Sequence, residues 1–272
     1  IKATAELAQV CHADAVLLVA PAQFLRPLCR DLAARWQPGT PALICAKGIE
    51  QESGALMSEV VAAELAGAQI AVLSGPTFAA EVARGLPAAV TLAAADEALG
   101  AALVAALGSP HFRPYLSADV IGAQIGGAVK NVLAIACGIV SGRRLGDNAR
   151  AALITRGLAE MMRLALAKGA SRDTLMGLSG LGDLVLTCSS EQSRNMSLGL
   201  ELGRGRRLAE ILEGRRTVAE GVASAPAVLA LAARLGADMP ISAAVDAIVH
   251  HGASVDDAIN GLLSRPFKGE WD

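Results

Sequence analysis

The sequence predicts an α/β domain followed by an all-α domain. In the first 118 residues, short β-rich segments alternate with amphipathic segments, which is the pattern of βα units on a parallel sheet. After residue 119 the strand patterns stop and long helical patterns take over. Apolar residues make up 53% of the chain and aromatic residues only 3%, a balance that favours helices packed through small side chains. We therefore expect a parallel-sheet domain over residues 1–118 and a helical domain over residues 119–272.

The sheet domain is predicted from apolar, β-rich runs that are followed by turns or helices. Such runs predict strands at residues 13–21, 41–47, 70–76, 88–95 and 112–117. Apolar residues at helical spacing predict helices at residues 25–36, 53–66 and 97–108. Ser53 is placed to cap the second of these helices, because a serine hydroxyl accepts hydrogen bonds from the first amides of a helix.

The second half of the chain reads as helix throughout. Helical periodicity covers residues 120–141, 148–168, 172–180, 190–203, 207–213, 220–235, 241–250 and 254–263. No stretch rich in Gly, Ser or Pro separates this half from the first, so the sequence contains no flexible linker there. We expect two domains that pack around a shared cleft.

Charge and composition exclude several classes of partner. A formal net charge of -2 and a pI near 6.1 argue against a general nucleic-acid or anionic-membrane surface. The five cysteines are widely spaced, with no C-x-x-C motif and no histidine at ligand spacing, which favours reduced thiols and no metal site. Neither a signal-like N-terminus nor an uninterrupted apolar span stands out. We expect a cytoplasmic protein without an integral membrane segment.

Two loops after predicted strands carry polar residues. A parallel sheet binds its ligand at the carboxyl ends of its strands, so these loops are candidate sites. Lys47 follows one strand; Gly75 and Thr77 follow the next, with Glu81 in the first turn of a possible helix. The glycine permits close backbone approach and the threonine offers a hydroxyl at a helix start. An ordinary strand-to-helix turn is the more common explanation of the Ser-Gly-Pro part of this pattern.

Lys130 is the most unusual residue of the helical half. It stands in the segment GAQIGGAVKNVLAIACGIV, which is apolar almost all round, whereas a helical lysine normally extends to the surface. Gly126 and Gly127, one turn earlier, leave room for another backbone or a ligand. We predict a buried amine, whose pKa is lowered by desolvation and by neighbouring cations, so that it can act as a base near neutral pH.

Asp183 is the predicted partner of this amine. It lies in the segment GLSGLGDLVLTCSSEQSRN, where glycines allow a tight turn and leucines flank the acid. A carboxylate among leucines needs a cationic partner, although capping of the next helix is the alternative. Ser189, three residues before Gln192, matches a capping box and predicts that a helix starts there.

Polar residues gather just inside that predicted helix. Ser193, Arg194 and Asn195 follow one another, and helix amides together with a guanidinium favour an anion such as phosphate. The alternative is that Arg194 is an ordinary surface residue. The sequence therefore offers a buried base with its counterion and a candidate anion site.

Taken in order, the motifs CAKGIE, SGPTFAAE, GGAVKN, GDNARAALITRGLAEM, GLGDLVLTC, SRN and VAEGV resemble the bacterial-type NAD(P)-dependent glycerol-3-phosphate dehydrogenase family. The resemblance implies a Rossmann domain and a helical substrate domain, with interconversion of sn-glycerol 3-phosphate and dihydroxyacetone phosphate for phospholipid synthesis. It implies Lys130, Lys47 and Asp183 as the catalytic residues. The implied substrate contacts are Lys47, Gly75, Thr77, Lys130, Asp183, Ser193, Arg194 and Asn195. The implied NAD or NADP contacts are Lys47, Ala79, Arg194, Val218 and Glu220.

The sequence departs from this family at its start. No G-x-G-x-x-G turn for the dinucleotide pyrophosphate is present, and residues 1–12 resemble the segment that follows two βα units. We therefore expect that the chain is part of a longer protein, and that residues outside this sequence set the preference between NAD and NADP. The apolar helices are compatible with a homodimer.

Two other functions are consistent with parts of the sequence. A β-hydroxyacid or 6-phosphogluconate dehydrogenase also uses a helical lysine, but those families resemble G-x-G-x-x-x-K-x-x-N, whereas Asn131 directly follows Lys130 here. A catalytically inactive interaction module is supported only by the missing glycine-rich turn. The adjacency of lysine and asparagine favours the glycerol 3-phosphate enzyme.

Overall fold

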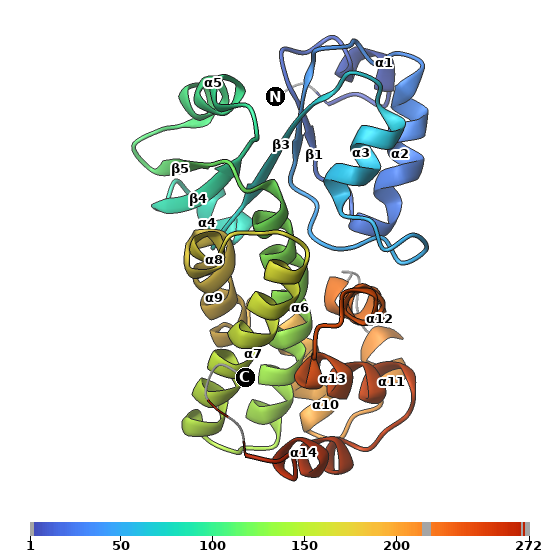
Figure 1. The fold of residues 1–272 in the computed structure, drawn as a ribbon, viewed down its shortest axis with the longest axis vertical. Helices are drawn as coiled ribbons and strands as arrows, with labels where there is room; N and C mark the ends of the chain where they lie inside the picture. The colour runs from blue at the N-terminus through green and yellow to red at the C-terminus, as the bar shows by residue number, and fades with distance from the viewer. Residues whose placement is uncertain (1–2, 214–218, 268, 270–272) are drawn as a thin grey trace.

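The computed structural model describes residues 3–213, 219–267 and 269, and its first part is built on a five-stranded sheet (Figure 1). The strands are β1 (Val16–Leu18), β2 (Pro41–Ile44), β3 (Gln69–Ser74), β4 (Ala88–Ala93) and β5 (Phe112–Ser117), hydrogen-bonded in that order. All five coincide with predicted strand segments, so the expected α/β class is confirmed.

One strand pairing differs from a purely parallel sheet. The pairs β1–β2, β2–β3 and β4–β5 are parallel, whereas β3 and β4 run antiparallel, with Val72 opposite Ala93. A parallel connection needs a crossover that packs across the sheet. The segment between β3 and β4 holds only the five-residue helix α4 (Ala79–Ala83), so β4 returns beside β3 in the opposite direction.

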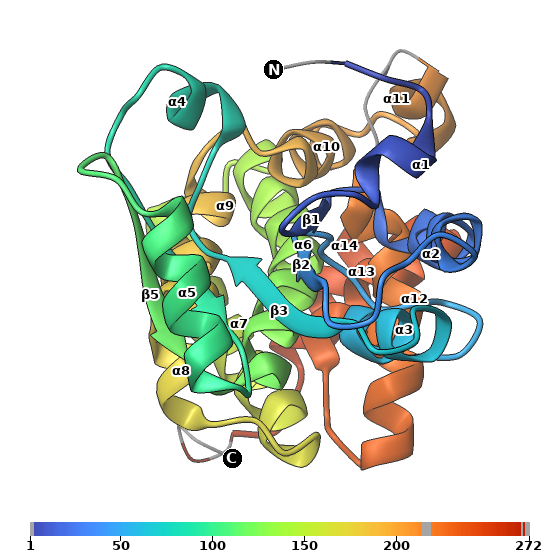
Figure 2. The ribbon, with the colours of Figure 1, turned by 90° about the horizontal axis from the view of Figure 1, so that it is seen from above.

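Helices cover both faces of the sheet. These are α1 (Leu7–Val10), the 3₁₀ turn η1 (Ala22–Phe24), α2 (Leu25–Ala33), α3 (Met57–Glu64) and α5 (Glu97–Leu107). Figure 2 shows α2 and α3 on one side of the sheet and α5 on the other. Leu25, Cys29 and Leu32 of α2 are fully or almost fully buried against the β1–β2 side, while Leu103 of α5 packs with Leu43 and Leu92.

The start of α3 differs from the prediction that Ser53 caps it. The helix begins at Met57, and the Glu59 carboxylate accepts a hydrogen bond from the Leu56 amide at 2.7 Å. Ser53 instead donates its hydroxyl to Glu50. The prediction was wrong because the glycine after Ser53 forms a turn, with φ of 67° at Gly54, before the helix starts.

The second part is entirely helical in the residues described. It contains α6 (Val120–Gly142), α7 (Asp147–Ala167), α8 (Arg172–Met176), the π-helical turn η2 (Leu178–Gly182), α9 (Asp183–Ser189), α10 (Arg194–Gly203), α11 (Leu208–Glu213), α12 (Glu220–Leu235), α13 (Pro240–His250) and α14 (Val255–Leu263). The helix α6 runs through the middle of this part (Figure 1), and each of its residues from 122 to 140 is buried.

Because it is central, α6 is far more apolar than a surface helix. It is long and apolar enough to cross a membrane, but 89% of its most apolar window is buried inside the protein. No other helix among the described residues passes the same test of length and composition. The composition of α6 is therefore that of a core helix.

Glycines bring α6 and α10 into backbone contact. A Cβ atom built on Gly199 would lie 2.0 Å from the carbonyl oxygen of Ile135, and one on Gly138 would lie 2.2 Å from the carbonyl oxygen of Met196. Gly142 and Gly203 are equally close to the opposing backbone. No residue with a side chain fits at these positions, so the glycines fix where α10 lies on α6.

Polar side chains join the sheet part to the helical part. Arg234 of α12 donates to the carbonyl oxygens of Ser53 and Gly54, each at 3.0 Å. Lys168, after α7, forms an ion pair with Glu59 of α3 at 2.8 Å. These contacts hold the segment before α3, and α3 itself, against the helical part.

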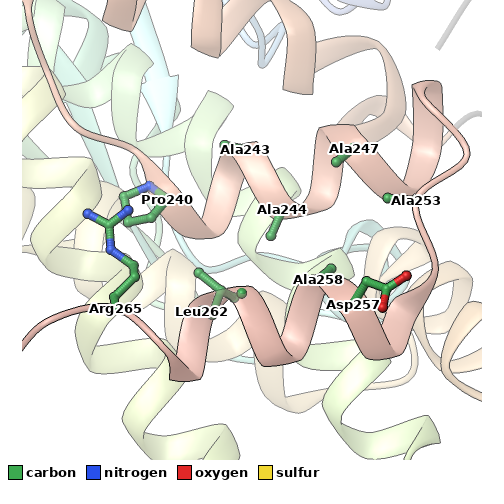
Figure 3. A pocket seen from close by; sticks show the side chains of 10 residues that line it. Pro240, Ala243, Ala244, Ala247, Ala253, Asp257, Ala258, Leu262 and Arg265 are labelled. Carbon is green, nitrogen blue, oxygen red and sulfur yellow. The ribbon is translucent and has the colours of Figure 1, made fainter.

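A shallow groove lies between α13 and α14 (Figure 3). Its lining residues are Pro240, Ala243, Ala244, Ala247, Ala253, Asp257, Ala258, Gly261, Leu262 and Arg265. Arg265 forms an ion pair with Asp238 at 2.6 Å. Half of these residues are alanine, and the lining includes none of the predicted site residues.

The glycine contact between α6 and α10 gives a stability prediction. We expect Gly199→Ala to lower the free energy of unfolding by about 2 kcal/mol, because the added methyl group overlaps the α6 backbone. Gly261→Ala in α14 is the matched control, since no atom lies within 4 Å of a Cβ placed there, and should stabilise by about 0.5 kcal/mol. Urea denaturation of both variants measures the two values, and equal effects would contradict the packing argument.

Candidate active site

Lys130 is buried in α6, as predicted. Only 6% of the residue is exposed, and its Nζ donates to the Asp183 carboxylate Oδ1 and, at 3.0 Å, to the Thr187 hydroxyl. The Thr187 hydroxyl in turn donates to the same carboxylate oxygen at 3.3 Å. The amine is therefore held in one orientation by two partners from α9.

Asp183 serves two lysines at once. It is 1% exposed, and its second carboxylate oxygen, Oδ2, accepts from Lys47 Nζ at 2.8 Å. Lys47 lies just beyond the end of β2 and its Nζ is also 3.5 Å from the carbonyl oxygen of Gly75. One carboxylate thus joins a lysine of the sheet part to a lysine of the helical part, and this Lys47–Asp183–Lys130 cluster is the centre of the site.

The charge balance of this cluster makes the Lys130 ammonium a stronger acid than an ordinary lysine. Burial lowers the pKa of Lys130, the nearby positive charge of Lys47 lowers it further, and Asp183 opposes both effects, with a resulting pKa of about 7. A lysine with this pKa exchanges its proton easily at neutral pH. Such a group can act as a general base when neutral and as a general acid when charged.

Glycines next to the cluster allow the backbones to approach. A Cβ atom on Gly126 would lie 2.3 Å from the carbonyl oxygen of Ser179 in η2, the turn that leads into Asp183. A Cβ atom on Gly127 would lie 3.3 Å from the Ser74 hydroxyl and 3.4 Å from Cγ of Lys47. The prediction that these two glycines make room beside Lys130 is confirmed: one admits η2, and the other admits the end of β3 with the stem of Lys47.

The three polar residues Ser193, Arg194 and Asn195 lie at the start of α10, as predicted, but the helix does not start at Ser189. That residue ends α9, and Ser193 is the N-cap, accepting from the Met196 amide at 3.2 Å. The capping-box prediction was wrong because Ser190 to Ser193 form a separate turn, closed by a Ser193 amide to Ser190 carbonyl bond of 3.0 Å.

Arg194 and Asn195 differ in their surroundings. Arg194 is the first residue of α10 and is exposed. Asn195 is buried, and its amide nitrogen donates to the Asn131 side chain at 2.9 Å while its oxygen accepts from the Gly221 amide at 2.9 Å. Asn195 therefore ties α10 to α6 and to the start of α12, with one N–H of its amide left for another partner.

The loop after β3 contributes the backbone side of the site. Gly75 is buried, and a Cβ atom there would lie 2.8 Å from Cα of Val90, so only glycine fits. The Thr77 hydroxyl lies 3.5 Å from the Gly75 carbonyl and does not cap α4, whose N-cap is Phe78. Ala79, the first residue of α4, is exposed at the edge of this loop.

The Glu220 carboxyl group interacts electrostatically with the two lysines of the cluster and with Arg194. Glu220 is the first residue of α12, and burial raises the pKa of its carboxyl group, while the positive charges of Arg194, Lys47 and Lys130 act in the opposite direction. The other predicted residue of this segment, Val218, lies outside the residues that the structure describes. Glu220 therefore belongs with the lysines and Arg194 in space, although it is far from most of them in sequence.

Two contact residues were not identified as site residues from the sequence. Thr187 stands four residues after Asp183, so both side chains lie on one face of α9 and reach Lys130 together. Asn131 follows Lys130 and links Asn195 to the Gly127 carbonyl. The i, i+4 spacing of Asp183 and Thr187 is a signal that the sequence does contain; the Asn131–Asn195 pair, 64 residues apart, has none.

A sheet with polar loops at its strand ends, followed by a helical part with a buried lysine, is consistent with a nicotinamide-dependent oxidoreductase, and the family matches show that class. Residues 1–100 match the family described as NAD-dependent glycerol-3-phosphate dehydrogenase N-terminus, and residues 119–260 match the C-terminus of the same family. The chain belongs to the NAD-dependent glycerol-3-phosphate dehydrogenase family.

Individual relatives agree with this assignment. The chain is 59% identical over 270 residues to a glycerol-3-phosphate dehydrogenase (NAD(P)+) of Parvibaculum lavamentivorans, covering 99% of this chain and 81% of the relative. It is 60% identical to the enzyme of the same name from Caulobacter vibrioides, with 99% and 82% covered. The crystal structure of glycerol-3-phosphate dehydrogenase from Coxiella burnetii matches with a TM-score of 0.92 at 40% identity, covering 95% of this chain and 79% of that chain.

The shared carboxylate gives a pH-dependent stability prediction. Asp183→Asn leaves Lys130 buried without a counterion, and we expect a loss of about 3 kcal/mol in the free energy of unfolding at pH 6. The loss should shrink at pH 9, above the pKa of about 7, because a neutral amine needs no counterion. Denaturant titrations at both pH values test this, with Asp183→Asn/Lys130→Met as the control that removes both charges. A loss that is equal at the two pH values would argue against a charge effect.

Proposed function

We propose that this protein interconverts sn-glycerol 3-phosphate and dihydroxyacetone phosphate, with NAD or NADP as the partner of the hydride transfer, and so supplies glycerol 3-phosphate for phospholipid synthesis. The observation that carries the proposal is the Lys47–Asp183–Lys130 cluster, which places a proton-exchanging lysine where the sheet and helical parts meet. Family membership and the activity in the names of the relatives support the same substrate.

Lys130 is the proposed proton carrier. Oxidation of a secondary alcohol removes a hydride from carbon and a proton from the hydroxyl group, so a base within hydrogen-bond reach of that hydroxyl is required. Neutral Lys130 accepts this proton and becomes an ammonium. In the reducing direction the ammonium stabilises the negative charge that develops on the carbonyl oxygen and then returns the proton.

Lys47 and Asp183 prepare Lys130 for this step. The charge of Lys47 lowers the pKa of Lys130 and adds positive potential where the substrate oxygen becomes negative. Asp183 holds both amines in place, and its ionic bonds keep the charge of the cluster close to that of a single cation. We propose catalytic roles for these two residues on this basis.

The substrate phosphate is proposed to bind at the start of α10. The amides of a helix N-terminus and an exposed guanidinium attract a dianion, and Arg194 supplies the guanidinium there. Ser193 caps α10 and Asn195 ties its start to α6, while Gly75 and Thr77 in the loop after β3 are the proposed substrate contacts from the sheet part. Binding energy from the phosphate then orients the reacting carbon toward Lys130.

We propose that residues around the cluster contact the nicotinamide end of the cofactor. Lys47 lies beside the Gly75 carbonyl, and the positive charges of Lys47 and Arg194 act on Glu220, so we propose Lys47, Ala79, Arg194 and Glu220 as cofactor contacts, together with Val218. When bound, the nicotinamide supplies the hydride chemistry. The protein residues orient the substrate and move the proton.

Three broader expectations are also kept as proposals. We place the domain boundary near residue 118, supported by the end of β5 at Ser117 and the start of α6 at Val120. A cytoplasmic location and a homodimer remain predictions from the sequence.

The decisive assay uses the protein expressed from its complete open reading frame. Oxidation of NADH and NADPH, followed by absorbance, should depend on dihydroxyacetone phosphate and should fall by about a thousandfold in Lys130→Ala and Lys130→Arg. Arginine stays charged at all accessible pH values and cannot replace the base. Circular dichroism confirms that the variants fold. Turnover of 6-phosphogluconate but not of dihydroxyacetone phosphate would overturn the substrate assignment.

The pKa of Lys130 predicts opposite pH profiles for the two directions. For oxidation of glycerol 3-phosphate, kcat/KM should rise as pH increases through about 7, because the neutral amine is the base. For reduction, kcat/KM should fall over the same range, because the ammonium is the acid. Profiles of both directions with the same enzyme test this. If both curves moved in the same direction, the titrating group would belong to another step.

A further inference from the structure

One side-chain hydrogen bond joins the two loops that flank the proposed ligand site. The Gln192 amide donates from Nε2 to the Glu81 carboxylate Oε1 at 3.2 Å. Glu81 lies in α4 of the sheet part, and Gln192 lies in the turn before α10 of the helical part. We propose that Glu81 and Gln192 form a clasp that sets the distance between these loops and thereby positions the substrate phosphate, an inference that rests on the proposed function.

On the sheet side, the clasp acts on the loop that follows β3. Glu81 comes two residues after Ala79 and four after Thr77. Its backbone is fixed, because its amide donates to the Phe78 carbonyl at 2.9 Å and its carbonyl accepts from the Leu86 amide at 3.1 Å. A change in the position of the Glu81 side chain therefore shifts the start of α4 and the loop before it.

On the helical side, the clasp acts on the cap of α10. The Gln192 backbone N–H donates to the Ser190 hydroxyl at 3.2 Å, and the Ser193 amide closes the turn onto the Ser190 carbonyl at 3.0 Å. Ser193 is the N-cap of α10 and Arg194 its first residue. A displacement of Gln192 moves the proposed phosphate site directly.

Apart from the Lys47–Asp183 ion pair of the cluster, the other polar links described between the two parts lie elsewhere. Arg234, Lys168 and Gln51 connect the helical part to residues 51–59, around the start of α3. Figure 2 shows α4 at the upper left of the molecule, away from α3. Near α4, the ring of Pro76 lies 3.5 Å from where a Cβ atom of Gly182 would be. This apolar contact limits how closely the loop after β3 approaches η2, but it does not orient the two segments. The Glu81–Gln192 hydrogen bond is directional and orients the loop relative to the start of α10.

Neither side chain belongs to the Lys47–Asp183–Lys130 cluster, so the clasp should act on binding more than on chemistry. In Gln192→Glu, two carboxylates face each other and repel. We expect the KM for dihydroxyacetone phosphate to rise about fivefold, the effect of one hydrogen bond, with kcat within about twofold of wild type. The exchanged pair Glu81→Gln/Gln192→Glu restores the bond with donor and acceptor reversed, and its KM should return toward the wild-type value.

A second double variant separates the bond from the charge. Glu191→Gln/Gln192→Glu has the same net charge as wild type and as the exchanged pair, because the exposed residue 191 loses the negative charge that residue 192 gains. It still leaves two carboxylates in the clasp. Its KM should stay raised. Equal repair in both doubles would show that net charge is what matters, and repair in neither would show that the charge at residue 192 is what matters. Either outcome would overturn the clasp.

Hydrogen exchange without ligand provides an independent measurement. Peptides covering residues 76–83 and 190–195 of the complete protein should exchange faster in Gln192→Glu, and at the wild-type rate in the exchanged pair. If the wild-type protein does not turn over dihydroxyacetone phosphate, the proposed function fails, while this exchange pattern still decides whether the clasp couples the loops. Unchanged exchange in Gln192→Glu would overturn it.

Discussion

The structure depends on one carboxylate that is shared by two lysines. Asp183 accepts from Lys130 of α6 and from Lys47 beyond β2, so a single ionic centre joins the sheet part to the helical part. Burying three charges is costly unless each is paired and hydrogen-bonded, and two lysines beside one aspartate leave an excess of one positive charge. That excess, together with desolvation, lowers the pKa of Lys130 to about 7. The unpaired positive charge makes the cluster less stable, and because it lowers the pKa of Lys130 it also allows that lysine to exchange a proton near neutral pH.

Glycines around this centre have no side chain and so allow neighbouring segments to pack closely against the backbone of α6 or α10. Gly126 admits the turn η2, Gly127 admits the stem of Lys47, and Gly199 seats α10 on α6. Each contact serves the same purpose, which is to bring a polar group from a neighbouring segment beside a helix that is otherwise completely buried. The apolar character of α6 follows from its central position. The glycines are the positions at which polar groups of neighbouring segments come into contact with it.

The site is therefore assembled from short, distant segments on rigid supports. The loop after β3, the start of α9, the start of α10 and the start of α12 all meet at α6, and Asn195 bonds to two of the other elements at once. The start of α10 is the proposed phosphate contact, because the amides and dipole of a helix start favour anions. The sheet contributes the loops after β2 and β3, because in open parallel sheets the ligand site lies at the carboxyl ends of the strands.

The sequence by itself determined the alternation of strands and helices, the all-helical second half, the burial of Lys130 and the choice of Asp183 as its partner. These follow from local composition: periodicity fixes the class of each element, and a charge in an apolar segment requires a counterion. Only the tertiary structure decided the antiparallel β3–β4 pairing, the cap at Ser193 in place of Ser189, the role of Thr187 and the sharing of Asp183 with Lys47. The β3–β4 pairing and the sharing of Asp183 depend on where segments far apart in the chain come together, about which local pattern contains no information. The Ser193 cap is set by a local turn that the sequence pattern did not reveal, and the role of Thr187 needs its contact with Lys130, 57 residues away.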